Sequence, residues 1–350
     1  MTRIALVGQG YMARTHAAAY AALGLGERIA YVCTPRPGAP IEGAPRARFV
    51  TDLATVLSDP DVGVLSVCTP TPTHADIAVA ALGAGKHVLL EKPIALTPDD
   101  AARIAKASST ATGTLMVAQV VRFFPGYEQV HATVEAGTIG TPVSVRAKRL
   151  SNRPDWAQWW ADESQSGGVL VDFAIHDFDQ LNLLLGQPVS VYSVRRDEFG
   201  PIETSVRYAS GAVGQVLSHC SLPAGAPFTS AIEVLGTEGS VEYTLLAGSA
   251  TEGDAGSALP GTNVVRTVTA DRRFDTDVPD DDPYTRQIDY FLRCIAGGVA
   301  PERSSVPSAI LALDVARAAR ESVRSEQKVV LSPEDFVPPE SDASTRRVDG

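Results

Sequence analysis

The sequence predicts an α/β protein in which an N-terminal Rossmann domain, a doubly wound parallel sheet, precedes a C-terminal α+β domain with a large, mostly antiparallel open sheet. The first third of the chain alternates short apolar runs with helix-length segments, which is typical of βαβ units. A glycine-rich turn follows the first of these runs. After about residue 120 the predicted strands lengthen and alternate apolar with polar residues, as strands with one solvated face do.

The chain length sets the expected number of domains. At about 150 residues per domain, the 350 residues correspond to two domains. We expect a dinucleotide-binding domain over 1–120, a substrate-binding and oligomerisation domain over 121–337, and a flexible tail over 338–350. The tail is rich in proline, serine and charge.

Apolar runs define the strands of the first domain. Buried parallel strands are predicted at 4–7, 29–33, 64–68, 87–90 and 114–117. The sequence Thr97-Pro98-Asp99-Asp100 supplies a capping hydroxyl, a proline suited to the first turn and an acidic third position, so a helix should run from there to about Ser109. The prolines and glycine of 35–40 predict a loop.

The second domain shows period-two alternation punctuated by glycine. Strands are predicted at 143–149, 189–195, 202–208, 213–217 and 231–235. Helices are predicted at 168–185, 284–296 and 307–325.

Composition and charge exclude several classes of protein. The net charge of −11 disfavours binding to a phosphate backbone. The four cysteines show no C-x-x-C spacing, which argues against a zinc ribbon and a disulfide framework and favours a reducing compartment. No apolar run reaches the roughly 20 residues of a membrane span. We therefore expect a cytoplasmic protein without a signal peptide, a membrane anchor or a nucleic-acid partner.

The turn after the first strand carries a dinucleotide-binding pattern. It reads Gly8-Gln9-Gly10-Tyr11-Met12-Ala13, with alanine in the third small position, and an alanine-rich helical run follows it. The first glycine permits the tight turn, the second lets the backbone approach a pyrophosphate, and Ala13 allows close helix packing.

The end of the second predicted strand bears on the choice of cofactor. NAD sites usually place a carboxylate there, but this chain has Thr34, with Arg36 two residues further on. A hydroxyl and a guanidinium can bind a 2′-phosphate that a carboxylate would repel, so NADP is favoured over NAD. The alternative is that Arg36 only solvates the proline-rich loop.

Two segments supply candidates for acid-base chemistry. Lys92 follows the fourth strand at the carboxyl edge of the sheet, where doubly wound folds bind ligands. On a continuous helix, Asp172, His176 and Asp179 would share one face, where a carboxylate can orient the imidazole. The alternatives are a surface lysine, a capping aspartate with a satisfied histidine, or a metal site, for which a third ligand is missing.

These residues resemble, as a set, the Gfo/Idh/MocA family of nicotinamide-dependent oxidoreductases. The matching segments span nearly the whole chain and are the turn from Gly8, Thr69-Pro70 with His74, Glu91-Lys92-Pro93, Arg122-Phe123, 167–179, 211–214, 236–240 and Asp282-Pro283-Tyr284.

The resemblance implies roles for individual residues. Lys92, Asp172 and His176 would be catalytic, with His176 accepting the proton of the reacting hydroxyl and the other two positioning and polarising the substrate. It also implies a cis peptide bond before Pro93. The expected cofactor-binding residues are Gly8, Gly10, Tyr11, Met12, Ala13, Thr34, Arg36, Thr69, Pro70, His74, Glu91 and Lys92.

The expected substrate is a sugar, a sugar derivative or a cyclitol. Besides the catalytic residues, its candidate ligands are Arg122, Asn152, Arg153, Asp155, Trp156 and Trp159. The predicted activity is hydride transfer between a hydroxyl or keto carbon and NADP, or NAD. We expect a homodimer or homotetramer, because an open sheet whose outer face carries apolar residues needs covering.

Two other functions compete with this prediction. A nicotinamide-binding sensor without turnover would not need Lys92, Asp172 and His176 together. A redox-neutral glycoside-cleaving enzyme with a retained cofactor would form product without a net change in nicotinamide absorbance.

Overall fold

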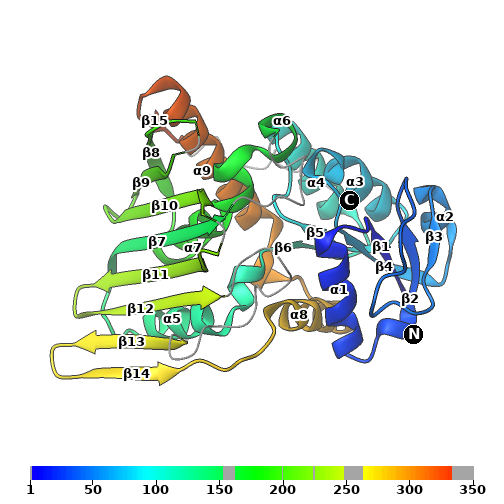
Figure 1. Cartoon of the computed structure of the whole chain (residues 1–350), viewed down its shortest axis with the longest axis horizontal. Helices are drawn as coiled ribbons and strands as arrows, with labels where there is room; N and C mark the ends of the chain where they lie inside the picture. Colours follow the sequence, from blue (N-terminus) through cyan, green and yellow to red (C-terminus); the bar gives the residue numbers. More distant parts are fainter. Residues whose placement is uncertain (1, 153–161, 199, 224, 248–262, 333–350) are drawn as a thin grey trace, which may run out of the picture.

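The computed structural model describes residues 2–152, 162–198, 200–223, 225–247 and 263–332. It contains one fully parallel sheet and one larger, mostly antiparallel sheet, with helices packed on both (Figure 1). The predicted fold class is therefore confirmed. The predicted tail over 338–350 lies outside the described residues.

The first sheet has six parallel strands in the order β3-β2-β1-β4-β5-β6. Each predicted strand is present within two residues of its predicted ends, and one short strand was not predicted. The strands are β1 (Arg3–Val7), β2 (Ile29–Cys33), β3 (Arg48–Val50), β4 (Val62–Val67), β5 (His87–Glu91) and β6 (Leu115–Ala118). The order reverses between β1 and β4, which makes their carboxyl ends the expected ligand crevice.

Four helices connect these strands. They are α1 (Tyr11–Ala22), α2 (Leu53–Ser58), α3 (His74–Gly83) and α4 (Pro98–Thr110). The Asp52 carboxylate caps α2, and the Thr97 hydroxyl accepts the Asp100 N–H at the start of α4, as the sequence predicts.

The second sheet has nine strands in the order β14-β13-β12-β11-β7-β10-β9-β8-β15. Only β7 and β10 pair in parallel. The strands are β7 (Pro142–Asn152), β8 (Pro188–Arg195), β9 (Ile202–Tyr208), β10 (Val213–Leu222), β11 (Phe228–Gly236), β12 (Gly239–Ala247), β13 (Val264–Thr269), β14 (Arg273–Asp277) and β15 (Val329–Val330). Strands β12 to β15 were not predicted.

Helices cover one face of this sheet and extend to the first one. They are α5 (Pro125–Glu135), α6 (Glu163–Ser166), α7 (Ile175–Leu185), α8 (Pro283–Gly297) and α9 (Val306–Ser325). α7 packs on β7 and α9, whereas α8 lies against α1 of the first sheet (Figure 1). None of the helices within the described ranges is both long and apolar enough to cross a membrane.

The segment before α7 differs from the prediction. Instead of one α-helix over 168–185, Val169–Phe173 forms a π-helical turn, and α7 begins only at Ile175. Gly167 and Gly168 precede the turn with positive φ angles of 80° and 74°. The turn places Asp172 differently from an α-helical position, so the simple i, i+4 relation to His176 does not hold.

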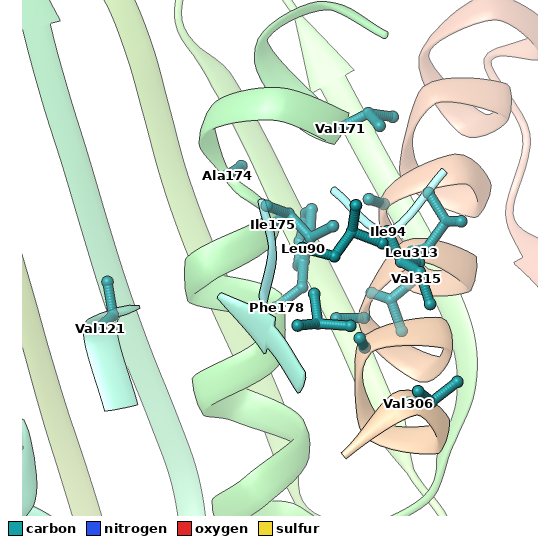
Figure 2. Close-up of a cluster of buried hydrophobic side chains, with 14 of the residues drawn as sticks. Leu90, Ile94, Val121, Val171, Ala174, Ile175, Phe178, Val306, Leu313 and Val315 are labelled. Carbon is teal, nitrogen blue, oxygen red and sulfur yellow. The ribbon is translucent and has the colours of Figure 1, made fainter. Parts of the chain in front are cut away.

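One hydrophobic cluster joins the two halves. Figure 2 shows Leu90 and Ile94, which flank the Glu91-Lys92-Pro93 segment, among side chains from α7 and α9 such as Phe178 and Leu313. All four side chains are fully buried. Packing on both sides of the segment therefore fixes the backbone from which Lys92 projects.

Candidate functional site

The turn between β1 and α1 has the geometry of a phosphate-binding loop. Gly8 has a φ of +108°, and a Cβ there would lie 2.4 Å from the Cys68 carbonyl oxygen. A Cβ on Gly10 would meet nothing within 4 Å, and Ala13 is fully buried. The helix start has no side-chain cap. Open space beside uncapped N–H groups suits the pyrophosphate of a dinucleotide.

Gln9 joins this turn to the loop that carries Arg36. Its side-chain amide donates to the Arg36 carbonyl oxygen and accepts the Gly38 N–H at 2.9 Å. Thr34 is buried at the end of β2, where its N–H donates to the Val50 carbonyl oxygen at 2.9 Å. The structure thus brings the loop expected to bind the cofactor ribose beside the glycine-rich turn.

A buried polar network lies beneath this turn. The His16 Nε2 is 3.0 Å from Glu91 Oε1, and its Nδ1 is 3.2 Å from the Ser66 hydroxyl. Burial lowers the pKa of His16, but the charges and hydrogen bonds of Cys68 and Glu91 outweigh burial and raise that pKa to about 10. Because Glu91 also accepts the Lys92 N–H at 3.2 Å, the network links α1 to the backbone of Lys92.

His74 connects two loops at the carboxyl edge of the sheet. Its ring nitrogens lie 2.9 Å from the Pro93 carbonyl oxygen and 3.0 Å from the Thr69 carbonyl oxygen. The side chain is buried. Since both nitrogens face protein carbonyls, His74 braces these loops, and its place near the cofactor stays a prediction.

Lys92 and Asp172 form an ion pair between the two halves. Lys92 Nζ donates to Asp172 Oδ1 at 3.0 Å and to its carbonyl oxygen at 2.7 Å. The two side chains are 18% and 15% exposed, so the pair is shielded but still open to a ligand. The Lys92–Pro93 peptide bond is cis, as the resemblance implies.

His176 lies at the start of α7 near this pair. Burial, with smaller contributions from the positive charges of Lys92 and Arg149, lowers its pKa well below the usual value. No group among the described residues hydrogen-bonds its buried Nδ1. Asp172 pairs with Lys92, and its expected role in orienting the imidazole stays a prediction. His176 is neutral at pH 7 and able to accept a proton.

Two buried ion pairs hold α7 in place. Arg149 on β7 binds both carboxylate oxygens of Asp177 at 2.9 Å. Arg122 donates from Nε to Asp179 Oδ2 at 2.8 Å and from Nη1 to the Arg303 carbonyl oxygen at 2.7 Å. The guanidinium of Arg122 thus has protein partners and positions α7, and its contact with the substrate stays a prediction.

The remaining substrate candidates are only partly described. Asn152 is buried at the end of β7. Arg153, Asp155, Trp156 and Trp159 lie outside the described residues. In the part of the chain that the structure covers, no three His, Cys, Asp or Glu side chains are grouped to hold a metal ion.

Sequence reasoning missed the residues that support the site. His16, Gln9, Arg149 and Asp177 were not selected. A histidine among the alanines of a buried helix face was a usable signal for His16, because a buried imidazole needs a polar partner. The arginine partners carried no local signal, since Arg149 and Asp177 lie 28 residues apart in sequence.

Two family models match the chain. One, described as an oxidoreductase family with an NAD-binding Rossmann fold, matches residues 2–119. The other, described as the C-terminal alpha/beta domain of an oxidoreductase family, matches residues 131–331.

Individual proteins are similar over most of their length. The chain is 26% identical to scyllo-inositol 2-dehydrogenase (NAD(+)) of Bacillus subtilis (strain 168), over 94% of this chain and 96% of the relative. It is 30% identical to inositol 2-dehydrogenase of Rhizobium meliloti (strain 1021), over 68% and 74% of the two chains. A solved structure of levoglucosan dehydrogenase in complex with NADH and levoglucosan has a TM-score of 0.79 and 25% identity, covering 94% and 99%.

Proposed function

The chain belongs to the Gfo/Idh/MocA family of oxidoreductases, and from this premise we propose that it transfers a hydride between a nicotinamide cofactor and a hydroxyl or keto carbon of a sugar, a sugar derivative or a cyclitol. Relatives named as dehydrogenases of inositols and of levoglucosan support this substrate class. The open phosphate-binding turn at Gly10 supports the cofactor.

The placement of Lys92, Asp172 and His176 is the observation that carries this proposal. A hydroxyl carbon can lose a hydride only if the hydroxyl proton also leaves. His176, held neutral by burial, is the base that accepts this proton. Its Nδ1 is buried away from solvent, so the proton of the substrate passes to Nε2.

Lys92 acts on the same substrate oxygen in this proposal. Its ammonium stabilises the negative charge that develops as the proton leaves. Asp172 holds the ammonium through the 3.0 Å contact and limits its motion. The nicotinamide, when bound, supplies the hydride acceptor or donor. In the reverse direction, His176 returns the proton to the nascent alkoxide.

The preference for NADP is the finer part of the proposal. Thr34 stands where a carboxylate would repel a 2′-phosphate, and Gln9 holds the loop of Arg36 beside the phosphate-binding turn. The relatives whose names state a cofactor are named with NAD(+) or NADH, which favours NAD. We expect NADPH to bind several-fold more tightly than NADH, and Thr34→Asp with Arg36→Ala to reverse the order. Tighter NADH binding by the parent would mean that Arg36 faces away from the ribose.

The activity is tested by a screen of sugars, cyclitols and their keto forms with both cofactors, followed by nicotinamide absorbance. We expect Lys92→Ala and His176→Ala each to lower turnover roughly 100-fold with little effect on cofactor binding. Exposed Arg293→Gln on α8 is the matched control. Near-normal turnover in either variant contradicts the assigned role, and product without an absorbance change identifies redox-neutral chemistry.

We also propose that the chain forms a homo-oligomer through the outer face of the large sheet. Tyr192 and Val194 on β8 and Val213 on β10 are 44%, 48% and 41% exposed. The face is less apolar than predicted, because Arg146 and Glu233 also lie on it. Light scattering at micromolar concentration tests this, and a monomer contradicts it.

A further inference from the structure

A cavity lies apart from the proposed catalytic group. It has a volume of about 840 Å³ and is bounded by α9, α6, the end of β8 and the π-helical turn. Lys92, Asp172 and His176 do not line it. A cavity of this size falls in the range of small-molecule sites.

The cavity wall is rich in arginine. Four arginines line it, namely Arg195, Arg317, Arg320 and Arg324, together with the acidic residues Glu163, Asp314 and Glu321. Glu163 lies 3.8 Å from Arg195, and Glu321 lies 2.5 Å from Arg324, so these two arginines have acidic partners.

The other two arginines lack such partners. Within the described residues no ion pair involves Arg317 or Arg320, and the Nε of Arg317 is buried without a hydrogen-bond partner. An unsatisfied buried donor on a charged group costs stability unless a ligand satisfies it. A hydrogen-bond acceptor inside the cavity would therefore satisfy the buried donor of Arg317.

The spacing of the arginines fits one anionic group. Residues 317, 320 and 324 recur at i, i+3 and i+7 on α9, which places them on one helix face. Guanidinium groups bind carboxylates and phosphates through paired N–H donors. We propose that this cavity binds a small oxyanion-bearing metabolite, a phosphate ester or a carboxylate, through Arg317 and Arg320.

A ligand in the cavity would also be linked to the proposed active site through the π-helical turn. Val169 and Leu170 line the cavity, and they belong to the same π-helical turn as Asp172, which holds Lys92. Occupancy of the cavity would restrict this turn. This part rests on the proposed function, whereas binding itself does not.

The test measures the thermal midpoint in rising inorganic phosphate or citrate, at constant ionic strength and with the nicotinamide cofactor at saturation. The cofactor keeps phosphate out of the turn at Gly10. We expect phosphate, citrate or both to raise the midpoint of the parent and of Arg293→Gln, which lies outside the cavity. Arg317→Gln with Arg320→Gln should weaken the apparent affinity at least tenfold. Comparison of the two anions shows which oxyanion the cavity prefers.

Two outcomes overturn the proposal. The first is that neither anion at 50 mM raises the thermal midpoint of the parent. The second is that the anions raise the midpoint of the double glutamine variant as much as that of the parent. Arg317→Lys with Arg320→Lys keeps both charges if the glutamine variant does not fold, and equal affinity of this variant contradicts paired binding by guanidinium groups. A phosphate or citrate effect on kcat in the parent but not in the variant supports the link to Asp172, and an unchanged kcat refutes that link.

Discussion

The buried pair of His16 and Glu91 makes stability depend on pH in a defined window. The pKa of His16 is about 10, against 6.5 for an unperturbed histidine, so the folded protein keeps a proton that the unfolded chain releases. Two neighbours stabilise this proton, namely Cys68, whose Sγ lies 3.5 Å from Nδ1, and Glu91, whose Oε1 lies 3.0 Å from Nε2.

The sign and size of the effect follow from linkage. A group whose pKa is raised on folding contributes its full stability below pH 6.5 and loses that stability as the pH approaches 10. One pKa unit corresponds to about 1.36 kcal/mol, so raising the pH from 7 to 9 should lower the unfolding free energy by roughly 2 to 3 kcal/mol through this group. His16→Gln keeps an amide that can hydrogen-bond but removes the titration.

The assay is urea unfolding followed by far-UV circular dichroism at pH 6, 7, 8 and 9. The parent should lose roughly 2 to 3 kcal/mol more unfolding free energy between pH 7 and 9 than His16→Gln does. Cys68→Ala should reduce this slope, because Cys68 contributes to the raised pKa of His16, and the exposed Arg293→Gln is the control that should keep the slope of the parent. Equal slopes in the parent and His16→Gln would refute the reasoning, and a slope fully lost in Cys68→Ala would identify the thiol as the dominant partner.

Three further predictions concern the site and its support. Asp172→Asn should lower kcat by roughly 10-fold to 100-fold by releasing Lys92, with the cofactor dissociation constant unchanged in a fluorescence titration. Arg122→Leu should lower the unfolding free energy in urea by about 3 to 5 kcal/mol, because Asp179 stays buried without its cation, and replacing both residues by leucine should recover part of the loss. Gly10→Ala should leave the thermal midpoint unchanged, since nothing lies within 4 Å of the added Cβ, yet weaken cofactor binding at least tenfold. An unchanged affinity for the cofactor in that variant would mean that the pyrophosphate does not bind beside Gly10.

Local pattern predicted the parallel sheet well because its strands are buried on both faces. Each such strand is a short, continuous apolar run, which differs from the mixed apolar and polar pattern of the neighbouring helices. Strand β14 (Arg273–Asp277) lacks this signal, because it is an edge strand with exposed, mostly polar residues. The π-helical turn was missed because its composition does not differ from that of an α-helix.

The catalytic candidates were found from motifs, but their partners were not. Lys92 and Asp172 are 80 residues apart and meet only through the fold. The prediction that Asp172 orients His176 came from the spacing on a continuous helix, which the π-helical turn interrupts. An ion pair such as Arg122 with Asp179 forms between side chains that the fold brings together. The separation of the two residues in the sequence does not show that they will meet.

The return of α8 to the first sheet has a consequence for dissecting the molecule. Ile288 and Phe291 are fully buried in the same cluster as Ile4 and Ala13, although more than 250 residues separate them in sequence. A fragment that stops near residue 120 would leave this apolar surface of α1 exposed to solvent, where it would favour aggregation. The cofactor-binding half is therefore assembled from segments far apart in the polypeptide, and a transplant of that half into another scaffold must carry α8 with it.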